Sequence, residues 1–252
     1  GQGGATVRVA DATSLAAAVM GDAPTVVVVS GKVSLDGMVR VGSNKTLVGA
    51  GPDAAITGGG LNLSRVRNVV IRNLTFRDSG DDAINVQDGS RHVWIDHCDL
   101  SHAKDGLIDI KRGSDLVTVS WCRFHDHHKT CLLGHSDAAD VLAGDRGHLR
   151  VTYHHNFFDG SRTRHPRVRA AETVHVFNNV FRGNEYGVAS TDDAGVLVEG
   201  NVFERVKAPT HTTYGDSKGA GRLVERHNLF VDSGAPETAG TVADVPYRYH
   251  LD

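Results

Sequence analysis

The chain has few cysteines, little net charge and no long apolar run. Three cysteines among 252 residues are too few for a disulfide-stabilised scaffold. A formal charge of −3 gives no reason to expect a nucleic-acid or membrane partner. No apolar segment approaches the roughly 20 residues that a membrane-spanning helix needs. No charged and then apolar leader is present, and the opening GQGGATV is compatible with a processed, exported protein.

Helical periodicity is almost absent as well. No helical pattern of a dozen residues separates the segments in which apolar and polar residues alternate. This argues against an α/β sheet with helical crossovers. The sequence also contains no recognisable linker, so we expect a single domain over residues 1–252. We also expect a monomer.

The sequence contains instead a repeat with a period near 24 residues. The segment DDAINVQDGSRHVWIDHCDL at 81–100 aligns with DGLIDIKRGSDLVTVSWCRF at 105–124. Similar alternating segments, each ending in an aromatic residue or leucine, begin at Val69, Val93, Val117, Val151, Val174, Val196 and Leu223. Alternation indicates strands with one buried face, and a fixed period is typical of a solenoid. The pattern predicts a parallel β-helix of about eight coils.

The irregular parts of the repeat predict the ends and the loops. A short helix is expected over residues 11–20, with Thr13 or Ser14 as N-cap and Gly21 as stop, because a solenoid must cover its open end. Longer steps in the repeat predict loops after about residue 134 and around residues 207–220. Residues 231–252 are expected to lie along the outside or to close the far end.

One position of the repeat predicts a ladder at a turn. It is occupied by Leu74, Cys98, Cys122, Asn156, Asn179, Asn201 and Asn228. Stacked asparagines can hydrogen-bond to one another and tolerate turn conformations. The two cysteines fall in register, so a disulfide is geometrically possible, with two packed thiols as the alternative. Cys131 would then remain unpaired.

The same register gathers acidic side chains on one exterior face. In the segment 107–111, Ile108 and Ile110 can face the core while Asp109 and Lys111 face outward. The carboxylates that the register places together are Asp81, Asp82, Asp105 and Asp109, with Asn85 one coil below Asp109. Like charges this close repel unless a cation neutralises them, and oxygen ligands of this kind suit Ca²⁺. A solvated acidic patch is the alternative, which the coil-to-coil register disfavours.

Cationic side chains continue this face. Lys129 lies one further period beyond Asp105, and residues 162–169 contain four arginines, Arg162, Arg164, Arg167 and Arg169. Arginine binds carboxylates through a bidentate fork. A strip from acids to lysine and arginine would suit a polymer with a carboxylate on each unit. An exposed basic strand or a nonspecific polyanion-binding patch is the alternative.

These residues resemble the polysaccharide lyase family 1 pectate lyases over most of the chain. The similarity is found in NKTLVGAG at 44–51, NVVIRNLTF at 68–76, VWIDH at 93–97, DGLIDIK at 105–111, Lys129-Thr, GHSD at 134–137 and RHPRVR at 164–169. The resemblance implies a right-handed parallel β-helix, secretion and Ca²⁺ dependence. It also implies endo-type β-elimination of α-1,4-polygalacturonate, which gives unsaturated oligogalacturonides.

The resemblance further implies roles for individual residues. Asp82, Asp105 and Asp109 match the family's Ca²⁺ ligands. Lys129 and Arg164 match its catalytic lysine and arginine, and Arg169 matches the second arginine of that motif. Lys111, Arg167 and Arg169 are expected to bind substrate. Because arginine is ordinarily protonated, Arg164 as a base implies an alkaline optimum.

The sequence departs from the family pattern at one position. The family often has an aspartate two residues before Asp82, where this chain has Gly80. Asp81 is the candidate that would replace this ligand.

Other functions remain open at this stage. A pectin lyase would act on methylated pectin without the Ca²⁺ carboxylates, a β-helical hydrolase would use clustered aspartates, and a β-helix can serve as a carbohydrate-binding protein. The first two fit less well, because the carboxylates are retained and the lysine and arginine set is not a hydrolase feature. His125, His127 and His128 could form a transition-metal site, but polar turn or groove residues fit them better.

Overall fold

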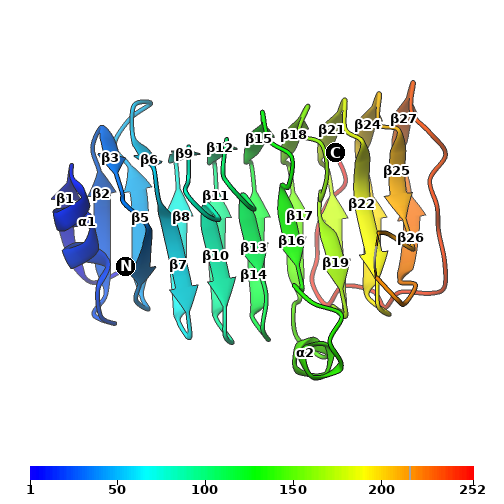
Figure 1. Cartoon of the computed structure of the whole chain (residues 1–252), viewed down its shortest axis with the longest axis horizontal. Helices are drawn as coiled ribbons and strands as arrows, with labels where there is room; N and C mark the ends of the chain where they lie inside the picture. Colours follow the sequence, from blue (N-terminus) through cyan, green and yellow to red (C-terminus); the bar gives the residue numbers. More distant parts are fainter. Residues whose placement is uncertain (216) are drawn as a thin grey trace.

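The chain folds as a parallel β-solenoid. A computed structural model describes residues 1–215 and 217–252, which form 27 strands and two helices. The strands stack coil upon coil from the N-terminal to the C-terminal end and build three parallel sheets along the whole length (Figure 1). This confirms the fold class expected from the repeat.

The three sheets are named here A, B and C. Sheet A has ten strands, β1 (Ala5–Val9), β2 (Thr25–Val29), β5 (Lys45–Gly49), β8 (Arg67–Arg72), β11 (Arg91–Asp96), β14 (Asp115–Ser120), β17 (Val151–His154), β20 (Val174–Phe177), β23 (Gly195–Glu199) and β26 (Arg222–Arg226). Sheet B has nine, β3 (Lys32–Ser34), β6 (Ala55–Thr57), β9 (Thr75–Arg77), β12 (Asp99–Ser101), β15 (Arg123–His125), β18 (Phe157–Asp159), β21 (Val180–Arg182), β24 (Val202–Glu204) and β27 (Leu229–Val231). Sheet C has eight, β4 (Met38–Val41), β7 (Gly60–Ser64), β10 (Ile84–Gln87), β13 (Ile108–Ile110), β16 (Cys131–Leu133), β19 (Arg167–Arg169), β22 (Tyr186–Thr191) and β25 (Ala208–His211).

The solenoid therefore has about ten coils, and the predicted number of eight is too low. The prediction counted mainly the strands that end in an aromatic residue or leucine. The first coils use short strands without that ending, such as β3 and β4, so the repeat pattern does not reveal them fully.

Alternation along the strands fills a continuous core. Phe124, Phe158, Phe181 and Phe203 are fully buried and stack ring on ring through successive strands of sheet B, with centroids 5.0, 4.8 and 4.4 Å apart. Each buried aromatic side chain removes a large apolar area from water and so stabilises the stack.

The predicted asparagine ladder is present between sheets A and B. The Nδ2 group of Asn156 donates to Oδ1 of Asn179 at 3.0 Å, Asn179 donates to Asn201 at 2.9 Å, and Asn201 donates to Asn228 at 2.9 Å. Because each side chain also bonds to backbone groups of adjacent coils, the ladder satisfies polar atoms that the turn would otherwise bury unpaired. At the corresponding positions earlier in the chain, Cys98 and Cys122 are buried free thiols, and Cys131 is also free.

Helix α1 (Ala12–Val19) covers the N-terminal end, as expected (Figure 1). The predicted N-cap, Thr13 or Ser14, is wrong. Asp11 is the N-cap, and its carboxylate accepts a hydrogen bond from the backbone N–H of Ser14 at 2.9 Å. Aspartate is a strong cap because its fixed negative charge also favours the helix N-terminus.

Two further segments lie outside the coils. Helix α2 (Ala139–Asp145) occupies the loop predicted after residue 134 and projects from the stack (Figure 1). The C-terminal tail returns along the outside of sheet A, where the Tyr247 hydroxyl bonds to Thr152 and His175. Neither helix in the described part of the chain has the length and hydrophobicity to traverse a bilayer.

Candidate functional site

Sheet C places the predicted acidic residues in register. In the pairing of β10 with β13, Ile84 lies beside Ile108, and Asn85 lies beside Asp109. Ile84, Ile108 and Ile110 are fully buried in the core. Asn85 and Asp109 alternate with these buried residues along their strands, so they point to the outer face. The predicted parity of this strand is therefore confirmed.

Three carboxylates meet at the turn that leads into sheet C. Asp81, Asp82 and Asp105 each offer an oxygen, and these oxygens all lie within 4.8 Å of one another. Lys129, one coil further, donates from Nζ to Oδ1 of Asp105 at 2.9 Å. Burial alone would raise the pKa of Asp105, but the hydrogen bond and the charge of Lys129 outweigh it and lower that pKa.

Asp109 is the most deeply buried of the four acids. Only 4% of its surface is exposed. Burial, together with the nearby charge of Asp82, raises the pKa of Asp109 to about 7. Lys111 offsets this in part, because its Nζ lies 3.6 Å from Asp82 Oδ2 and 3.9 Å from Asp109 Oδ2. The carboxyl pair of Asp82 and Asp109 is therefore short of positive charge.

Gly106 allows the two carboxylates to approach each other. A Cβ atom at this position would lie 2.1 Å from Asp109 Oδ1 and 3.1 Å from Asp82 Oδ1. Its backbone N–H donates to Asp82 Oδ1 at 2.8 Å. Any larger residue would displace Asp109, so glycine is needed here for space.

The residues present fit a hard cation. Asp109 Oδ1 and Asn85 Oδ1 are both buried oxygens without a hydrogen-bond partner among the described residues. Buried polar atoms are normally paired, so two orphaned oxygens on adjacent strands leave acceptor capacity for an ion. Oxygen donors of this kind are those that Ca²⁺ prefers. The family pattern often has an acid at the position of Gly80. The next residue in this chain, Asp81, belongs to the acidic cluster.

Arg164 follows on the next coil. The chain bridges Lys129 to Thr163, and the carbonyl of Arg164 accepts a hydrogen bond from the Cys131 N–H at 2.7 Å. Arg164 has a φ of 66°, a left-handed conformation that is rare for residues other than glycine. Its charge helps to lower the pKa of Asp105 and opposes part of the rise in the pKa of Asp109, so its guanidinium lies within electrostatic reach of these two acids.

Two of the other three arginines in residues 162–169, Arg167 and Arg169, are buried and bonded. Arg169 donates from Nε to Asp137 Oδ1 at 2.5 Å and from Nη1 to the Gly134 carbonyl at 3.0 Å. Arg167 donates to Ser217 Oγ at 2.9 Å and lies over the ring of Tyr214, 5.1 Å from its centroid. Each arginine thus fixes a loop beside sheet C.

The three histidines of residues 125–128 do not gather around a common point. His125 bonds to Asp99 at 2.9 Å and to Asp126 at 2.7 Å, whereas His127 donates from Nε2 to the Asp105 carbonyl at 2.7 Å. In the part of the chain that the structure describes, the only metal-compatible cluster of His, Cys, Asp or Glu is the acidic one. The histidine reading is therefore not supported, and His127 instead holds the backbone of Asp105.

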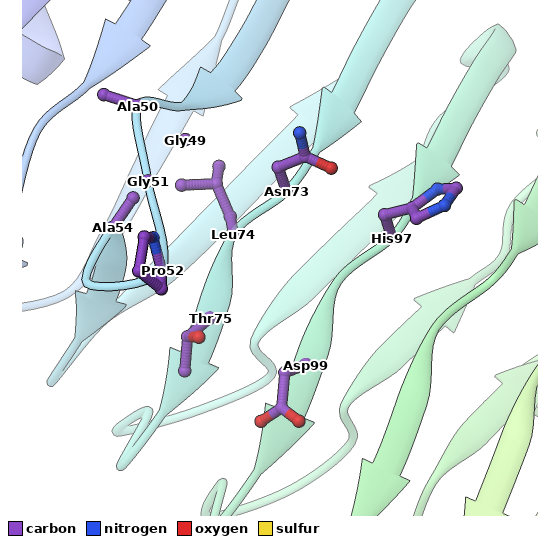
Figure 2. Close-up of a pocket in the computed structure, with 10 residues that line it drawn as sticks. All are labelled: Gly49, Ala50, Gly51, Pro52, Ala54, Asn73, Leu74, Thr75, His97 and Asp99. Atoms are coloured by element: carbon purple, nitrogen blue, oxygen red, sulfur yellow. The ribbon is translucent and has the colours of Figure 1, made fainter.

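A surface cavity of about 580 Å³ opens beside Asp105 and Lys129 and is also lined by His127, His128 and Arg162. Another, of about 480 Å³, lies at the turns between sheets A and B (Figure 2). Its lining has no lysine or arginine and a single acid, Asp99. It is therefore unsuited to a polyanion, and the site on sheet C remains the candidate.

Sequence reasoning missed several contributors to this site. Gly106 was visible only as part of a repeat, and its packing role needs coordinates. Asp137 belongs to the GHSD motif at 134–137, but nothing in the sequence shows that it pairs with Arg169. For Asn85 the sequence does contain a signal, because the repeat places it in register with Asp109.

Comparisons with known proteins agree with this arrangement. Residues 2–229 match the family model described as pectate lyase. Pectate lyase A from Emericella nidulans is 42% identical over 247 residues, which cover 93% of this chain and 72% of the fungal protein. A pectate lyase from Bacillus sp. N165, solved with trigalacturonate, superposes with a TM-score of 0.91 at 28% identity, covering 100% of this chain and 90% of that one. The cedar pollen allergen jun a 1 superposes with a TM-score of 0.84 at 26% identity, covering 98% and 83%.

Proposed function

Because the chain belongs to the pectate lyase family, we propose that it cleaves de-esterified polygalacturonate internally, by Ca²⁺-dependent β-elimination. The chain is a polysaccharide lyase, as its relatives are. The observation that supports the finer statement most is the continuous strip from the acids through Lys129 to Arg164 on adjacent coils. A bound trigalacturonate in the Bacillus enzyme supports an oligogalacturonate substrate.

We assign the metal ligands to Asp82, Asp105 and Asp109, with Asp81 in place of the acid absent at Gly80. The orphaned Asp109 oxygen and the shared negative charge support this assignment. When bound, Ca²⁺ supplies Lewis acidity that makes a uronate carboxylate a better electron sink. Lys111, which lies between Asp82 and Asp109, would turn from these acids toward a substrate carboxylate.

Lys129 would stabilise the charge that develops during the reaction. Its side chain is 40% exposed and bonded to Asp105, so its ammonium can exchange that contact for a substrate carboxylate. Loss of the C5 proton spreads negative charge over C5 and its carboxylate. A fixed cation at that point lowers the barrier more than it favours the ground state.

Arg164 would be the base. It removes the proton from C5, the C4–O4 bond breaks, a C4=C5 double bond forms, and water protonates the departing O4. Arg164 has a left-handed backbone, and its charge acts on Asp109 of the acidic site. Since arginine is ordinarily protonated, the neutral form is more abundant at high pH, and we expect an alkaline optimum.

Arg167 and Arg169 would contribute to substrate binding from their buried positions. Arg169 holds the loop that contains Gly134 and Asp137, and Arg167 holds the one that contains Tyr214 and Ser217. Both loops border sheet C, so the arginines would shape the edges of the groove. A catalytic role for Arg169 remains a prediction that follows from the resemblance.

The substrate also suggests where the protein works. A polymer of this kind cannot cross a membrane, so we place the enzyme outside the cell. We expect it to act as a monomer, because the groove is built from coils of a single chain. Light scattering of the purified protein checks the second point.

The test compares two polymers under two conditions. The enzyme is given polygalacturonate or highly methylated pectin, with Ca²⁺ or with a chelator, and ultraviolet absorbance reports the unsaturated product. We expect activity only on polygalacturonate, and only when Ca²⁺ is present. Activity on methylated pectin in chelator would instead identify a pectin lyase, and no activity on either polymer would indicate a binding protein.

A further inference from the structure

Lys129 and Arg164 belong to two adjacent coils that backbone hydrogen bonds join. Lys129 forms a β-bridge with Thr163, the residue before Arg164. The N–H of Thr130 donates to the Thr163 carbonyl at 3.0 Å. The N–H of Cys131 donates to the Arg164 carbonyl at 2.7 Å. The two cationic residues are therefore anchored on neighbouring segments of one parallel pair.

Each of these two residues is followed by one whose side chain lies in the core. The side chain of Lys129 is 40% exposed, and Thr130 after it is fully buried. Arg164 is half-buried, and His165 after it is fully buried. A contact that holds the inner side chain of either segment therefore also limits where the preceding residue leaves the surface.

The two inner side chains bond to each other. Oγ1 of Thr130 lies 3.1 Å from Nε2 of His165, and Oγ of Ser161 lies 2.9 Å from the same nitrogen. Nδ1 of His165 lies 2.7 Å from the Tyr186 carbonyl and donates to it, because a carbonyl can only accept. Burial lowers the pKa of His165 to about 3, so the ring is neutral and its Nε2 accepts from the two hydroxyls.

This bond adds a restraint that the backbone does not supply. The backbone hydrogen bonds fix the separation of the two segments, whereas the bond from Thr130 to His165 fixes how each segment is rotated about its own axis. Rotation of either segment would carry its outer side chain with it. Because Thr130, Ser161 and His165 are all fully buried, a lost bond is not replaced by solvent.

We propose that Thr130 and His165 are positioning residues, whose buried hydrogen bond holds Lys129 and Arg164 at the separation that the elimination needs. The inference deepens the proposed function and rests on the roles assigned there to Lys129 and Arg164. Neither positioning residue touches the sugar, because both side chains lie inside the coil. A reacting group displaced by about 1 Å can cost about 10²-fold in rate, so loss of the bond should affect the chemical step more than substrate binding.

The test compares Thr130→Val, which keeps the shape of the side chain and removes the hydroxyl, with Thr130→Ser, which keeps the hydroxyl. We expect kcat of Thr130→Val on polygalacturonate to fall roughly tenfold, with KM changed less than about twofold. Thr130→Ser should stay within about twofold of the parent protein in both constants. Unchanged kcat in folded Thr130→Val would overturn the proposal. An equal loss in Thr130→Ser would also overturn it, because the lost methyl contact would then explain both results.

The control is Thr210→Val, at a buried residue of β25 far along sheet C from the acidic cluster. Its hydroxyl donates to the Glu237 carbonyl at 2.7 Å, so the substitution removes a hydroxyl of the same kind. We expect kcat and KM of this variant to equal those of the parent protein, and thermal unfolding confirms that all variants are folded. A loss of kcat as large as in Thr130→Val would refute a specific role for Thr130.

Hydrogen exchange measures the contact in the free protein, where the bond is already formed. In Thr130→Val, we expect the amides of Thr130 and Cys131, which bond to the adjacent coil, to exchange about fivefold faster. In Thr130→Ser and Thr210→Val they should exchange as in the parent protein. Parent rates in Thr130→Val would contradict the positioning role.

The two readouts separate this inference from the proposed function. If the parent protein gives no unsaturated product but the two amides still exchange faster in Thr130→Val, the proposed function fails and the positioning contact stands. If the parent protein gives the product but neither kcat nor exchange responds to the substitution, the positioning inference alone fails.

Discussion

Replacing Gly106 by alanine is the sharpest test of the cation site. The new methyl carbon would lie 2.1 Å from Asp109 Oδ1, 2.9 Å from Asp109 Cγ and 3.1 Å from Asp82 Oδ1. Ordinary van der Waals contacts begin near 3.5 Å, so the Asp109 carboxylate must retreat by more than about 1 Å. The backbone of Gly106 is not left-handed, so the substitution adds no conformational strain of its own.

The size of the effect follows from the tolerance of the metal. Calcium–oxygen distances fall within about 2.3–2.6 Å, so a carboxylate moved by about 1 Å is lost as a ligand. Disturbing the surroundings of a metal site typically costs about 10–100-fold in affinity. We therefore expect Ca²⁺ binding to Gly106→Ala to weaken by this factor, or about 1.4–2.7 kcal/mol. Overpacking of this kind costs roughly 1–3 kcal/mol in folding stability.

Calorimetric titration with CaCl₂ at constant pH measures the affinity, and thermal unfolding confirms that the variant is folded. The matched control is Gly37→Ala, where the added Cβ would meet no heavy atom within 4 Å. It should bind Ca²⁺ like the parent protein. If folded Gly106→Ala keeps the parent affinity, Asp82 and Asp109 are not the ligands and the reasoning is wrong.

Three other predictions concern the base and the frame that supports it. Arg164→Ala should lower kcat by roughly 10²–10⁴-fold, whereas Arg162→Ala, at an exposed residue paired with Glu185, should change it only a few-fold; steady-state rates on polygalacturonate compare the two. Burial lowers the pKa of His165 to about 3, below the value near 6.5 in the unfolded chain. The neutral, buried His165 therefore contributes fully to folding stability above pH 6.5. As the pH falls toward 3, protonation of the unfolded chain removes this contribution. In denaturant titrations, His165→Gln should reduce the slope of unfolding free energy between pH 4 and 6 by up to about 1.4 kcal/mol per unit, and an unchanged slope would contradict the assignment. Asn179→Ala should cost about 2–4 kcal/mol in unfolding free energy, since it breaks the middle of the ladder and leaves buried groups unpaired, and more than Asn228→Ala at the ladder's less buried end.

The repeat predicted the fold because solenoid contacts follow the sequence period. Residues 24 apart become neighbours, so the pairing of Asn85 with Asp109 could be read directly from the chain. The asparagine ladder was predictable for the same reason. The first coils were not predicted, because strands such as β3 are only three residues long and lack the aromatic residue or leucine that ends the repeat.

The site was predictable as a set of residues but not as a geometry. The register explained why Lys129 reaches Asp105. The position of Arg164 depends on an irregular loop with a left-handed residue, which no periodic pattern encodes. The pairing of Arg169 with Asp137 joins segments whose separation depends on the inserted helix α2, so only the folded structure reveals it.

The most direct test of the account is to count the ends that the enzyme makes. Polygalacturonate is digested with Ca²⁺, and the same sample is assayed for new reducing ends and for unsaturated ends by ultraviolet absorbance. Elimination at Arg164 and Lys129 predicts one unsaturated end for every new reducing end. New reducing ends without matching absorbance would mean hydrolysis and would contradict the account.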